Sequence, residues 1–280
     1  MNGLLLVDGS NLLFQMFYGM PARIIGKNGK PIQGTLGFVG ALGKMIRMVH
    51  PTYIAVVFDG ECDNERKEID SAYKANRPDY SQTPEEDTPF LQLPDIFRAL
   101  ELLRIPCAET SCCEADDWIA GFARKYEDQM AVTIASQDSD FFQLISHNVT
   151  VLRYRGQNSV LCDSAYIQEK LGIQPEQYAD FKSLVGDPAD NIRGADKIGP
   201  KTAAELLRQF GSLEGIFDHL ENVKKPAVQE SLRKNADRLR CNQKLIRLSG
   251  CENLPFALED MVYHPDYRST TQILQDLGLR

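Results

Sequence analysis

The stretch Cys113-Glu114-Ala115-Asp116-Asp117-Trp118 places three acidic residues directly before an apolar run that extends to Ala123. This pattern predicts the start of a helix, with carboxylates on its first turn and an apolar face turned toward a core. A local interpretation is a capping box, with Ser111 as the N-cap, Glu114 at the third helical position, and the other acids favourable to the helix dipole. Acidic residues elsewhere in the chain favour a functional interpretation.

Three short apolar runs, rich in β-branched residues, resemble strands that are buried on both faces of a parallel sheet. Acidic residues stand at or just after the ends of these runs, namely Asp8, Asp59, Asp138 and Asp140. Functional groups collect at the carboxyl ends of the strands in open α/β sheets. We therefore expect these acids to converge with those at positions 114–117.

Carboxylates that converge repel one another. Two unit charges about 4 Å apart cost roughly 4 kcal/mol at an effective dielectric constant near 20. Either raised pKa values or divalent cations must compensate. Oxygen ligands without histidine or cysteine suit Mg²⁺ or Mn²⁺. Asp187 and Asp190, three residues apart, add two more acids that can face one way. The sequence predicts a metal site with room for more than one ion.

The order of the elements predicts an α/β fold with a mostly parallel sheet and right-handed crossovers. The length of 280 residues suits one large domain with a small appendage. From residue 180 the pattern becomes all helical, so we expect the sheet domain over 1–179 and a helical subdomain over 180–250. The remaining residues, 251–280, are expected to return to the core and to end in a helix over 270–279.

The composition favours a cytoplasmic protein without a membrane span. No apolar run approaches the roughly 18 residues that a membrane helix needs, and no basic leader precedes the first strand. Of the seven cysteines none form a C-x-x-C pair, and the adjacent Cys112 and Cys113 have poor disulfide geometry, so we expect reduced thiols. Zinc is not expected, because the four histidines lack ligand spacing.

The net charge of −8 does not exclude nucleic acid, because the nine acids assigned to the metal cluster leave +1 for the rest of the chain. Residues 224–247 contain eight basic residues against Glu230 and Asp237. This segment is either a solvated helix face or a surface that follows a nucleic-acid backbone.

Residues 61–90 are polar, contain Pro78, Pro84 and Pro89, and lack a sustained apolar stripe. A solvated loop is one interpretation. The other is functional, since long irregular segments in compact domains often carry function. Within the segment, Tyr73 could stack on a base, and Lys74 and Arg77, on one face of a helical turn, could contact phosphates.

The stretch from Gly194 to Leu207 predicts a hairpin whose glycine and proline precede a helix. Free backbone N–H groups at such a helix start bind phosphate without reading base sequence. A simple helix–turn–helix connection is the alternative. A Walker A loop is excluded, because Pro200 separates Gly199 from Lys201 and no strand precedes.

Taken together, these motifs resemble the 5′ nuclease (flap endonuclease) family, in the bacterial form found at the N-terminus of DNA polymerase I or as a free-standing 5′–3′ exonuclease. The resemblance covers essentially the whole chain. It is carried by the segments 6–10, 57–60, 73–77, 114–117, 138–140, 186–191 and 198–202. It implies a Rossmann-like, PIN-like nuclease sheet, a helical arch at about 61–90, and a helix–hairpin–helix subdomain.

The resemblance also implies roles for individual residues. Lys74 and Arg77 would steer the scissile phosphate, and Tyr73 would belong to the DNA-binding surface. A hairpin with a bound K⁺ would hold duplex DNA through Lys197, Gly199, Lys201 and Thr202. Two or three Mg²⁺ or Mn²⁺ ions would bind two subsets of acids, the first comprising Asp8, Asp59, Glu114, Asp116 and Asp117, and the second Asp138, Asp140, Asp187 and Asp190. One departure from the family pattern is Ser136-Gln137 before Asp138.

The expected activity is metal-dependent hydrolysis of phosphodiester bonds at DNA 5′ ends and 5′ flaps, in replication and repair. The expected partners are DNA with a 5′ end or flap beside a duplex, and a DNA polymerase, bound or fused. We expect a monomer at the bacterial nucleoid. The alternatives are a PIN-type ribonuclease, a non-catalytic DNA-binding module and, less favoured, a haloacid-dehalogenase-like phosphatase, which would need Asp-x-Asp where the chain has Asp8-Gly9-Ser10. The balance of exonuclease and flap endonuclease activity stays open.

Overall fold

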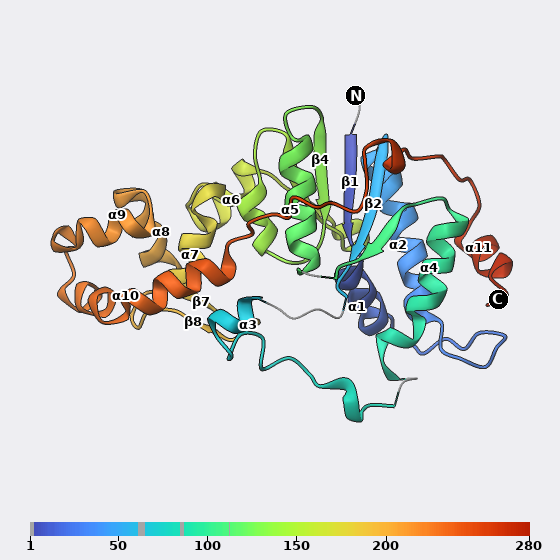
Figure 1. Cartoon of the computed structure of the whole chain (residues 1–280), viewed down its shortest axis with the longest axis horizontal. Coiled ribbons are helices and arrows are strands. Elements are labelled where there is room, and N and C mark those ends of the chain that lie inside the picture. The colour runs from blue at the N-terminus through green and yellow to red at the C-terminus, as the bar shows by residue number, and fades with distance from the viewer. Residues whose placement is uncertain (1–2, 61–64, 85–86, 112) are drawn as a thin grey trace.

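A computed structural model describes residues 3–60, 65–84, 87–111 and 113–280 (Figure 1). Its main sheet has the strand order β3-β2-β1-β4-β5-β6. The first five strands run parallel and β6 is antiparallel at the edge, which confirms the predicted mostly parallel sheet. The strands are β1 (Gly3–Asp8), β2 (Tyr53–Phe58), β3 (Cys107–Glu109), β4 (Ala131–Ala135), β5 (Val149–Arg153) and β6 (Val160–Cys162).

Helices cover both faces of this sheet, because successive side chains of a strand point to opposite sides. Leu4 and Leu6 of β1 face α5 (Ala115–Tyr126) and belong to one core cluster. Leu5 and Val7 face the opposite side and belong to a second cluster. The helices of that second face are α1 (Gly9–Gly19), α2 (Gln33–Val49) and α4 (Leu93–Leu102). Strands buried on both faces explain the continuous apolar runs in the sequence.

A helical part extends from one edge of the sheet, at the left in Figure 1. Its elements are α6 (Ser164–Leu171), α7 (Tyr178–Val185), α8 (Pro200–Phe210), α9 (Leu213–Asp218) and α10 (Pro226–Ile246), with a short pair of strands, β7 (Gly186–Asp187) and β8 (Ile192–Arg193). Buried leucines such as Leu207 and Leu232 join the same core cluster as α5. The helical part therefore packs as a continuation of the sheet domain, and α7 spans the predicted boundary at residue 180.

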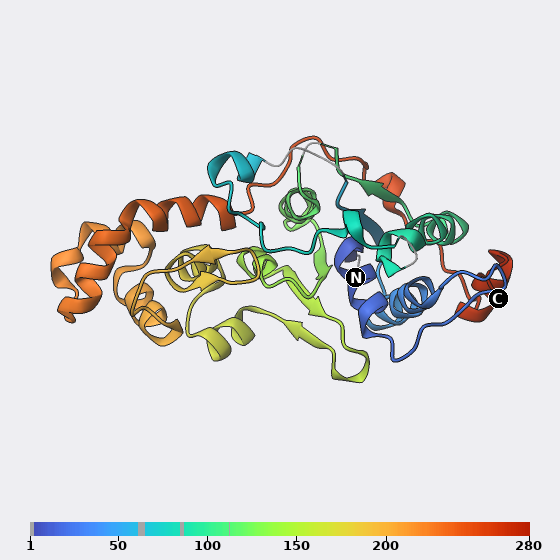
Figure 2. The same cartoon turned by 90° about the horizontal axis from the view of Figure 1, so that it is seen from below.

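After α10 the chain returns across α5 and the sheet to α11 (Thr270–Asp276), as Figures 1 and 2 show. Met261 of this return segment, residues 247–269, is fully buried. The Tyr263 N–H donates to the carbonyl oxygen of Thr52 at 2.8 Å, beside the start of β2. These contacts hold the return segment against the core, and the terminal helix is shorter than the predicted helix over 270–279.

The segment 61–90 crosses below the carboxyl ends of the strands (Figure 2). Residues 61–64 and 85–86 lie outside the described part of the chain. The rest contains one short helix, α3 (Glu65–Ile69), and the 3₁₀ turns η1 (Tyr80–Gln82) and η3 (Pro89–Gln92). Arg66 and Tyr73 of this segment are buried, so the interpretation as a solvated loop does not hold for these two residues. Among the described residues no helix combines the length and the apolar character that a membrane span requires.

Candidate active site

Four acidic side chains from four different elements line one hollow of about 610 Å³. Asp8 and Asp59 come from the ends of β1 and β2, Asp116 from the first turn of α5, and Asp138 from the turn after β4. A fifth acid, Glu114, and the basic residues Lys67, Lys74 and Arg77 complete the charged lining. The structure thus brings the predicted strand-end acids together with the acidic helix start, as parallel neighbouring strands require.

Asp8 is the best-defined member of this group. It ends β1 and also caps α1, where its Oδ1 accepts from the Asn11 N–H at 2.9 Å. Its Oδ2 accepts from Ser136 Oγ at 2.8 Å. A Cβ atom on the next residue, Gly9, would lie 2.6 Å from the ring of Phe58, so only glycine fits this tight turn.

The start of α5 differs from the predicted capping box. Glu114 itself occupies the N-cap position with an extended backbone, and α5 begins at Ala115, so Ser111 lies outside the helix. The donor at the helix start is satisfied from a distant strand, since Asp59 Oδ1 accepts from the Ala115 N–H at 2.9 Å. A strand-end acid therefore performs the capping that local sequence assigned to Ser111.

Three acids of the second predicted subset also form a compact group, whereas the fourth, Asp138, lines the first hollow. Asp140, Asp187 and Asp190 are buried, and their carboxylate oxygens lie within 4.8 Å of one another. Lys182 of α7 hydrogen-bonds to Asp187, and its Nζ lies 3.6 Å from Asp140 Oδ1. This Asp140 oxygen is buried and has no hydrogen-bond partner among the described residues. A buried carboxylate oxygen in that state is suited to a cation.

Burial and mutual repulsion perturb these acids. Burial, followed by the charge of Asp59, raises the pKa of Asp8 to about 7. Burial, followed by the charge of Asp138, raises the pKa of Asp140 to about 7. The pKa values of Asp116 and Asp138 are raised by burial as well, and for Asp116 repulsion from Asp138 is the next cause. The donor set is all oxygen and resists carrying its full negative charge alone, so it fits hard divalent cations.

Asp117 does not line this hollow, and the geometry does not fit its predicted role as a metal ligand. Its two oxygens accept from Arg66 Nη1 at 2.8 Å and Nη2 at 2.9 Å. Arg66 Nη1 also donates to Glu114 Oε2 at 2.7 Å, and Arg66 Nε donates to the Leu245 carbonyl at 3.0 Å. Asp117 therefore fixes Arg66, which ties α3 to the start of α5 and to the last turn of α10.

Lys74 and Arg77 of the crossing segment, residues 61–90, point at the acids, but they do not lie on one helical turn as the sequence predicted. Lys74 adopts a positive φ of 56° within a series of turns. Its Nζ lies 2.6 Å from Glu114 Oε1, and Arg77 Nη2 lies 3.0 Å from Asp190 Oδ1. Burial lowers the pKa of Lys74, but Glu114 and Asp116 outweigh it, so the net pKa is raised. Lys74 is therefore positively charged at neutral pH.

Tyr73 does not offer its ring to a base in this structure. Only 4% of the residue is exposed, and it packs with Ala179, Ile192 and Leu245. Its hydroxyl donates to Glu114 Oε2 at 3.4 Å. In place of the predicted stacking surface, the ring anchors the segment 61–90 to the helical part in this structure. Aromatic rings that do reach the hollow belong to Phe14 and Phe90.

The hairpin residues lie at the start of α8, with exposed Lys197 and Lys201. Gly199 is the N-cap, Pro200 follows it, and a Cβ on Gly199 would meet open space. The first helical bond runs from the Ala203 N–H to the Gly199 carbonyl at 3.0 Å. The N–H groups of Lys201 and Thr202 precede that bond, so this helix start can accept a phosphate.

The basic segment 224–247 is largely the exposed face of α10, and ion pairs neutralise part of it. Arg233 pairs with Glu221 and Glu230, and Arg240 pairs with Glu214. The local excess of positive charge is therefore smaller than the sequence of this segment predicts, because Glu221 and Glu214, which lie outside it, pair with its arginines.

Sequence reasoning missed Arg66, Lys182 and Ser136. Each has at least one partner that is distant in the sequence, namely Asp117, Asp140 and Asp8, respectively, so no local motif identifies their roles. For Ser136 the available signal was its departure from the family pattern. Its hydroxyl donates to Asp8 and accepts a hydrogen bond from the Asp138 N–H at 3.0 Å, so it links these two acids.

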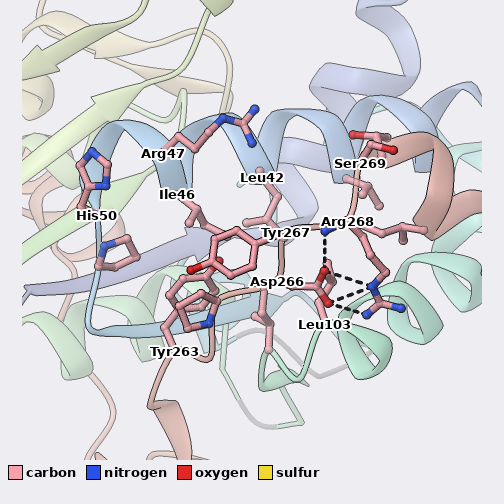
Figure 3. Close-up of a pocket in the computed structure, with 17 residues that line it drawn as sticks. Leu42, Ile46, Arg47, His50, Leu103, Tyr263, Asp266, Tyr267, Arg268 and Ser269 are labelled. Carbon is pink, nitrogen blue, oxygen red and sulfur yellow. Dashed lines mark hydrogen bonds and ion pairs between the residues drawn. The ribbon is translucent and has the colours of Figure 1, made fainter.

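A second hollow, of about 770 Å³, lies between α2 and the return segment, toward the amino end of β2 (Figure 3). Figure 3 shows Leu42 and Ile46 of α2 beside Tyr263 and Tyr267, and His50 at the C-cap of α2. Of the described residues that line it, Asp266 is the carboxylate, and it pairs with Arg268. This hollow lacks the convergent acids and is not the candidate active site.

Comparisons with known proteins agree with this geometry. Residues 3–172 match the family described as 5′-3′ exonuclease, N-terminal resolvase-like domain, and residues 173–269 match 5′-3′ exonuclease, C-terminal SAM fold. The chain is 33% identical to a 5′-3′ exonuclease of Aquifex aeolicus over 282 residues, which cover 100% of this chain and 93% of that protein. It is 37% identical to DNA polymerase I of Rhizobium leguminosarum over 94% of this chain, but only 26% of the polymerase is covered. The chain thus spans about a quarter of such polymerases.

Solved structures give the same result. The 5′-exonuclease of bacteriophage T5 with bound zinc superposes with a TM-score of 0.73 at 25% identity, covering 88% of this chain and 90% of that one. A T5 flap endonuclease in a pseudo-enzyme-product complex with DNA and metal ions superposes with a TM-score of 0.72 at 25% identity, over 88% of this chain and 89% of that one.

Proposed function

Because the chain belongs to the 5′-3′ exonuclease family, we propose that it hydrolyses phosphodiester bonds at DNA 5′ ends and 5′ flaps with the help of divalent metal ions. The observation that carries this proposal is the hollow where Asp8, Asp59, Asp116 and Asp138 meet opposite Lys74 and Arg77. Acids that can hold cations and basic groups that can hold a phosphate share one space there. A non-catalytic DNA-binding module would gain nothing from acids that repel DNA.

The acids divide into two adjoining sets. Asp8, Asp59, Glu114 and Asp116 would hold one ion or group of ions, and Asp138, Asp140, Asp187 and Asp190 the other. We propose two or three Mg²⁺ or Mn²⁺ ions, which suit an all-oxygen donor set. When bound, such ions supply an activated water nucleophile and stabilise the negative charge that develops on the phosphate. Asp117 supports the first set indirectly through Arg66.

The protein's own cations would hold the scissile phosphate in place. Lys74 and Arg77 now pair with Glu114 and Asp190, at 2.6 Å and 3.0 Å. A phosphate in the hollow would compete for the same N–H donors, and fixed positive charge is most effective when charge on the phosphate increases toward the transition state. Phe14 and Phe90 border the same hollow and could stack on an unpaired base.

Duplex DNA would be held away from the hollow at the start of α8. Lys197, Gly199, Lys201 and Thr202 form an exposed helix start that contacts a backbone phosphate without reading sequence. We propose K⁺ as the ion that helps this hairpin bind phosphate. A monomer acting beside a DNA polymerase, bound or fused, at the bacterial nucleoid is consistent with the polymerase relatives.

The test is cleavage of a 5′-labelled flap DNA in the presence of Mg²⁺, Mn²⁺ or excess EDTA. We expect cleavage near the junction with either metal and none with EDTA. Single-stranded RNA of the same sequence tests the PIN-type ribonuclease alternative, and Asp138→Asn provides the inactive control. Preferential cleavage of the RNA, or binding of the flap without cleavage under every metal condition, would reject the proposal.

A further inference from the structure

Two thiols, those of Cys113 and Cys251, meet where the return segment crosses the start of α5. The Cys251 thiol donates to the sulfur of Cys113, and the two Sγ atoms lie 3.2 Å apart. A disulfide bond is about 2.05 Å long, so the sulfur atoms need to approach by about 1.2 Å to form one. The two residues are 138 positions apart in the sequence, so only the fold can bring them together.

Backbone contacts hold Cys251 in this position. Its N–H donates to the carbonyl oxygen of Asp117 at 3.1 Å. Gly121, one turn further along α5, permits the close approach, because a Cβ there would lie 2.5 Å from the carbonyl oxygen of Cys251. Arg124 donates to the carbonyl oxygens of Leu248 and Ser249. The return segment is therefore fixed against α5 at Cys251 and at the residues just before it.

Solvent can reach the pair. Cys113 and Cys251 are both partly exposed, and both line a hollow of about 300 Å³ together with Lys244 and Arg247. An oxidant as small as a hydroperoxide fits such a space. The thiols therefore combine proximity, fixed placement and access, which a disulfide-forming pair needs.

We propose that Cys113 and Cys251 form a reversible disulfide that fastens the return segment to the start of α5. With hydrogen peroxide as the oxidant, one thiol is first oxidised to a sulfenic acid while the O–O bond breaks and one water leaves. The sulfur of the second thiol then attacks the sulfenic sulfur, which forms the S–S bond and releases a second water. The two thiols lose two electrons and two protons in total, and the peroxide is reduced to two waters.

The bond would close a long loop and so restrict the unfolded chain far more than the folded one. The folded state needs only a small approach of the two sulfur atoms. We therefore expect the oxidised protein to melt several degrees higher than the reduced protein. This stabilisation does not depend on the nuclease function.

The test treats the full chain with hydrogen peroxide and analyses it by mass spectrometry. We expect an intact mass lower by two hydrogen atoms and a peptide that links Cys113 to Cys251, with full reversal by dithiothreitol. The link should persist in Cys112→Ser, which removes the neighbouring thiol, and in Cys241→Ser, the matched control on α10. It should be lost in Cys113→Ser and in Cys251→Ser, with Cys251→Ala as the second variant if the serine variant does not fold.

Thermal melting completes the test. Oxidation should raise the melting temperature of the unsubstituted protein and leave that of the folded Cys251 variant unchanged. A link through Cys112 or Cys241 in place of Cys113–Cys251, or oxidation of Cys113 to a sulfinic acid without any link, would overturn the pairing. A Cys113–Cys251 link that lowers the melting temperature, or leaves it unchanged, would overturn the stabilising role.

Discussion

Two adjacent acids on the first turn of α5 should respond in opposite ways to the same substitution. Asp117 is held by both Nη atoms of Arg66, at 2.8 Å and 2.9 Å, and only 12% of its side chain is exposed. Asp116 faces the hollow, where Asp138, Asp8 and Asp59 surround it. We compare Asp117→Asn with Asp116→Asn, each of which removes one charge and almost no volume.

Asp117→Asn should lower the free energy of unfolding. The asparagine retains one acceptor oxygen but turns an N–H₂ group toward the guanidinium, so one of two charge-assisted bonds to Arg66 is lost. Breaking a buried ion pair costs about 3–5 kcal/mol. Glu114 still contacts Arg66 at 2.7 Å, so we expect the lower end, about 3 kcal/mol. For a protein of this size that corresponds to a fall in Tm of about 10 °C.

Asp116→Asn should raise the free energy of unfolding when metal is absent. Burial and the neighbouring acids raise the pKa of Asp116, so its ionised form is disfavoured in the folded state. A neutral side chain removes this cost, so the variant should be more stable than the unsubstituted protein at neutral pH. The same substitution removes a predicted metal ligand, so cleavage should be abolished.

The assay combines urea unfolding in EDTA with single-turnover cleavage of a 5′ flap in Mg²⁺, at a temperature where both variants are folded. Asp117→Asn should be less stable yet retain cleavage, and Asp116→Asn should be more stable yet inactive. The reasoning is refuted if Asp117→Asn keeps normal stability and loses cleavage, because that pattern would make Asp117 a direct ligand. An equal loss of stability in the two variants would also refute the different roles assigned to Asp116 and Asp117.

Three further predictions concern charge. Lys74→Ala should slow the single-turnover step more than it weakens flap binding, because the charge of Lys74 acts mainly in the transition state. The control is Lys67→Ala, which removes an exposed lysine of the same hollow. An equal effect of Lys74→Ala on rate and affinity would contradict the assignment. Lys201→Ala should weaken binding to every duplex sequence alike and reduce the slope of the logarithm of the binding constant against the logarithm of the salt concentration by about one. Lys125→Ala on α5 is the control. A loss of binding that depends on the DNA sequence would contradict the prediction. The metal-free protein should lose stability as the pH rises from about 4 to about 7. The pKa of Asp8 is raised to about 7, so in this range the folded state holds a proton that the unfolded state has released. Mg²⁺ should restore stability at the upper end of the range, and a stability that does not change with pH in EDTA would contradict the raised pKa.

The strand-end acids were predictable because two local signals coincide at each of them. A β-branched apolar run indicates a buried strand, and an acid at its end indicates the functional edge of a sheet. Asp8, Asp59 and Asp138 follow this rule, and the structure brings them together. The edge strand β6 was not predicted, since its three residues are too few to show a period and Leu161 is exposed.

Side-chain direction at the acidic helix start was not predictable. Asp116 and Asp117 are chemically identical neighbours, and the sequence offers no reason to separate them. Arg66 separates them from 51 positions away. The burial of Tyr73 was not predictable for the same reason, because it depends on Ala179, Ile192 and Leu245, which belong to other segments. Long-range partners, not local propensity, decide such orientations.

The charges around the acids support the proposal that this protein uses divalent ions to act on DNA. Among the described residues, the nine predicted acids contact four basic side chains, Arg66, Lys74, Arg77 and Lys182. Four positive charges against nine carboxylates leave an excess of five negative charges, and two divalent ions would neutralise nearly all of it. Ions on Glu114 and Asp190 would also weaken the hold of these acids on Lys74 and Arg77. Those two cations could then turn to a substrate phosphate, so metal binding and DNA binding should reinforce each other through the same carboxylates.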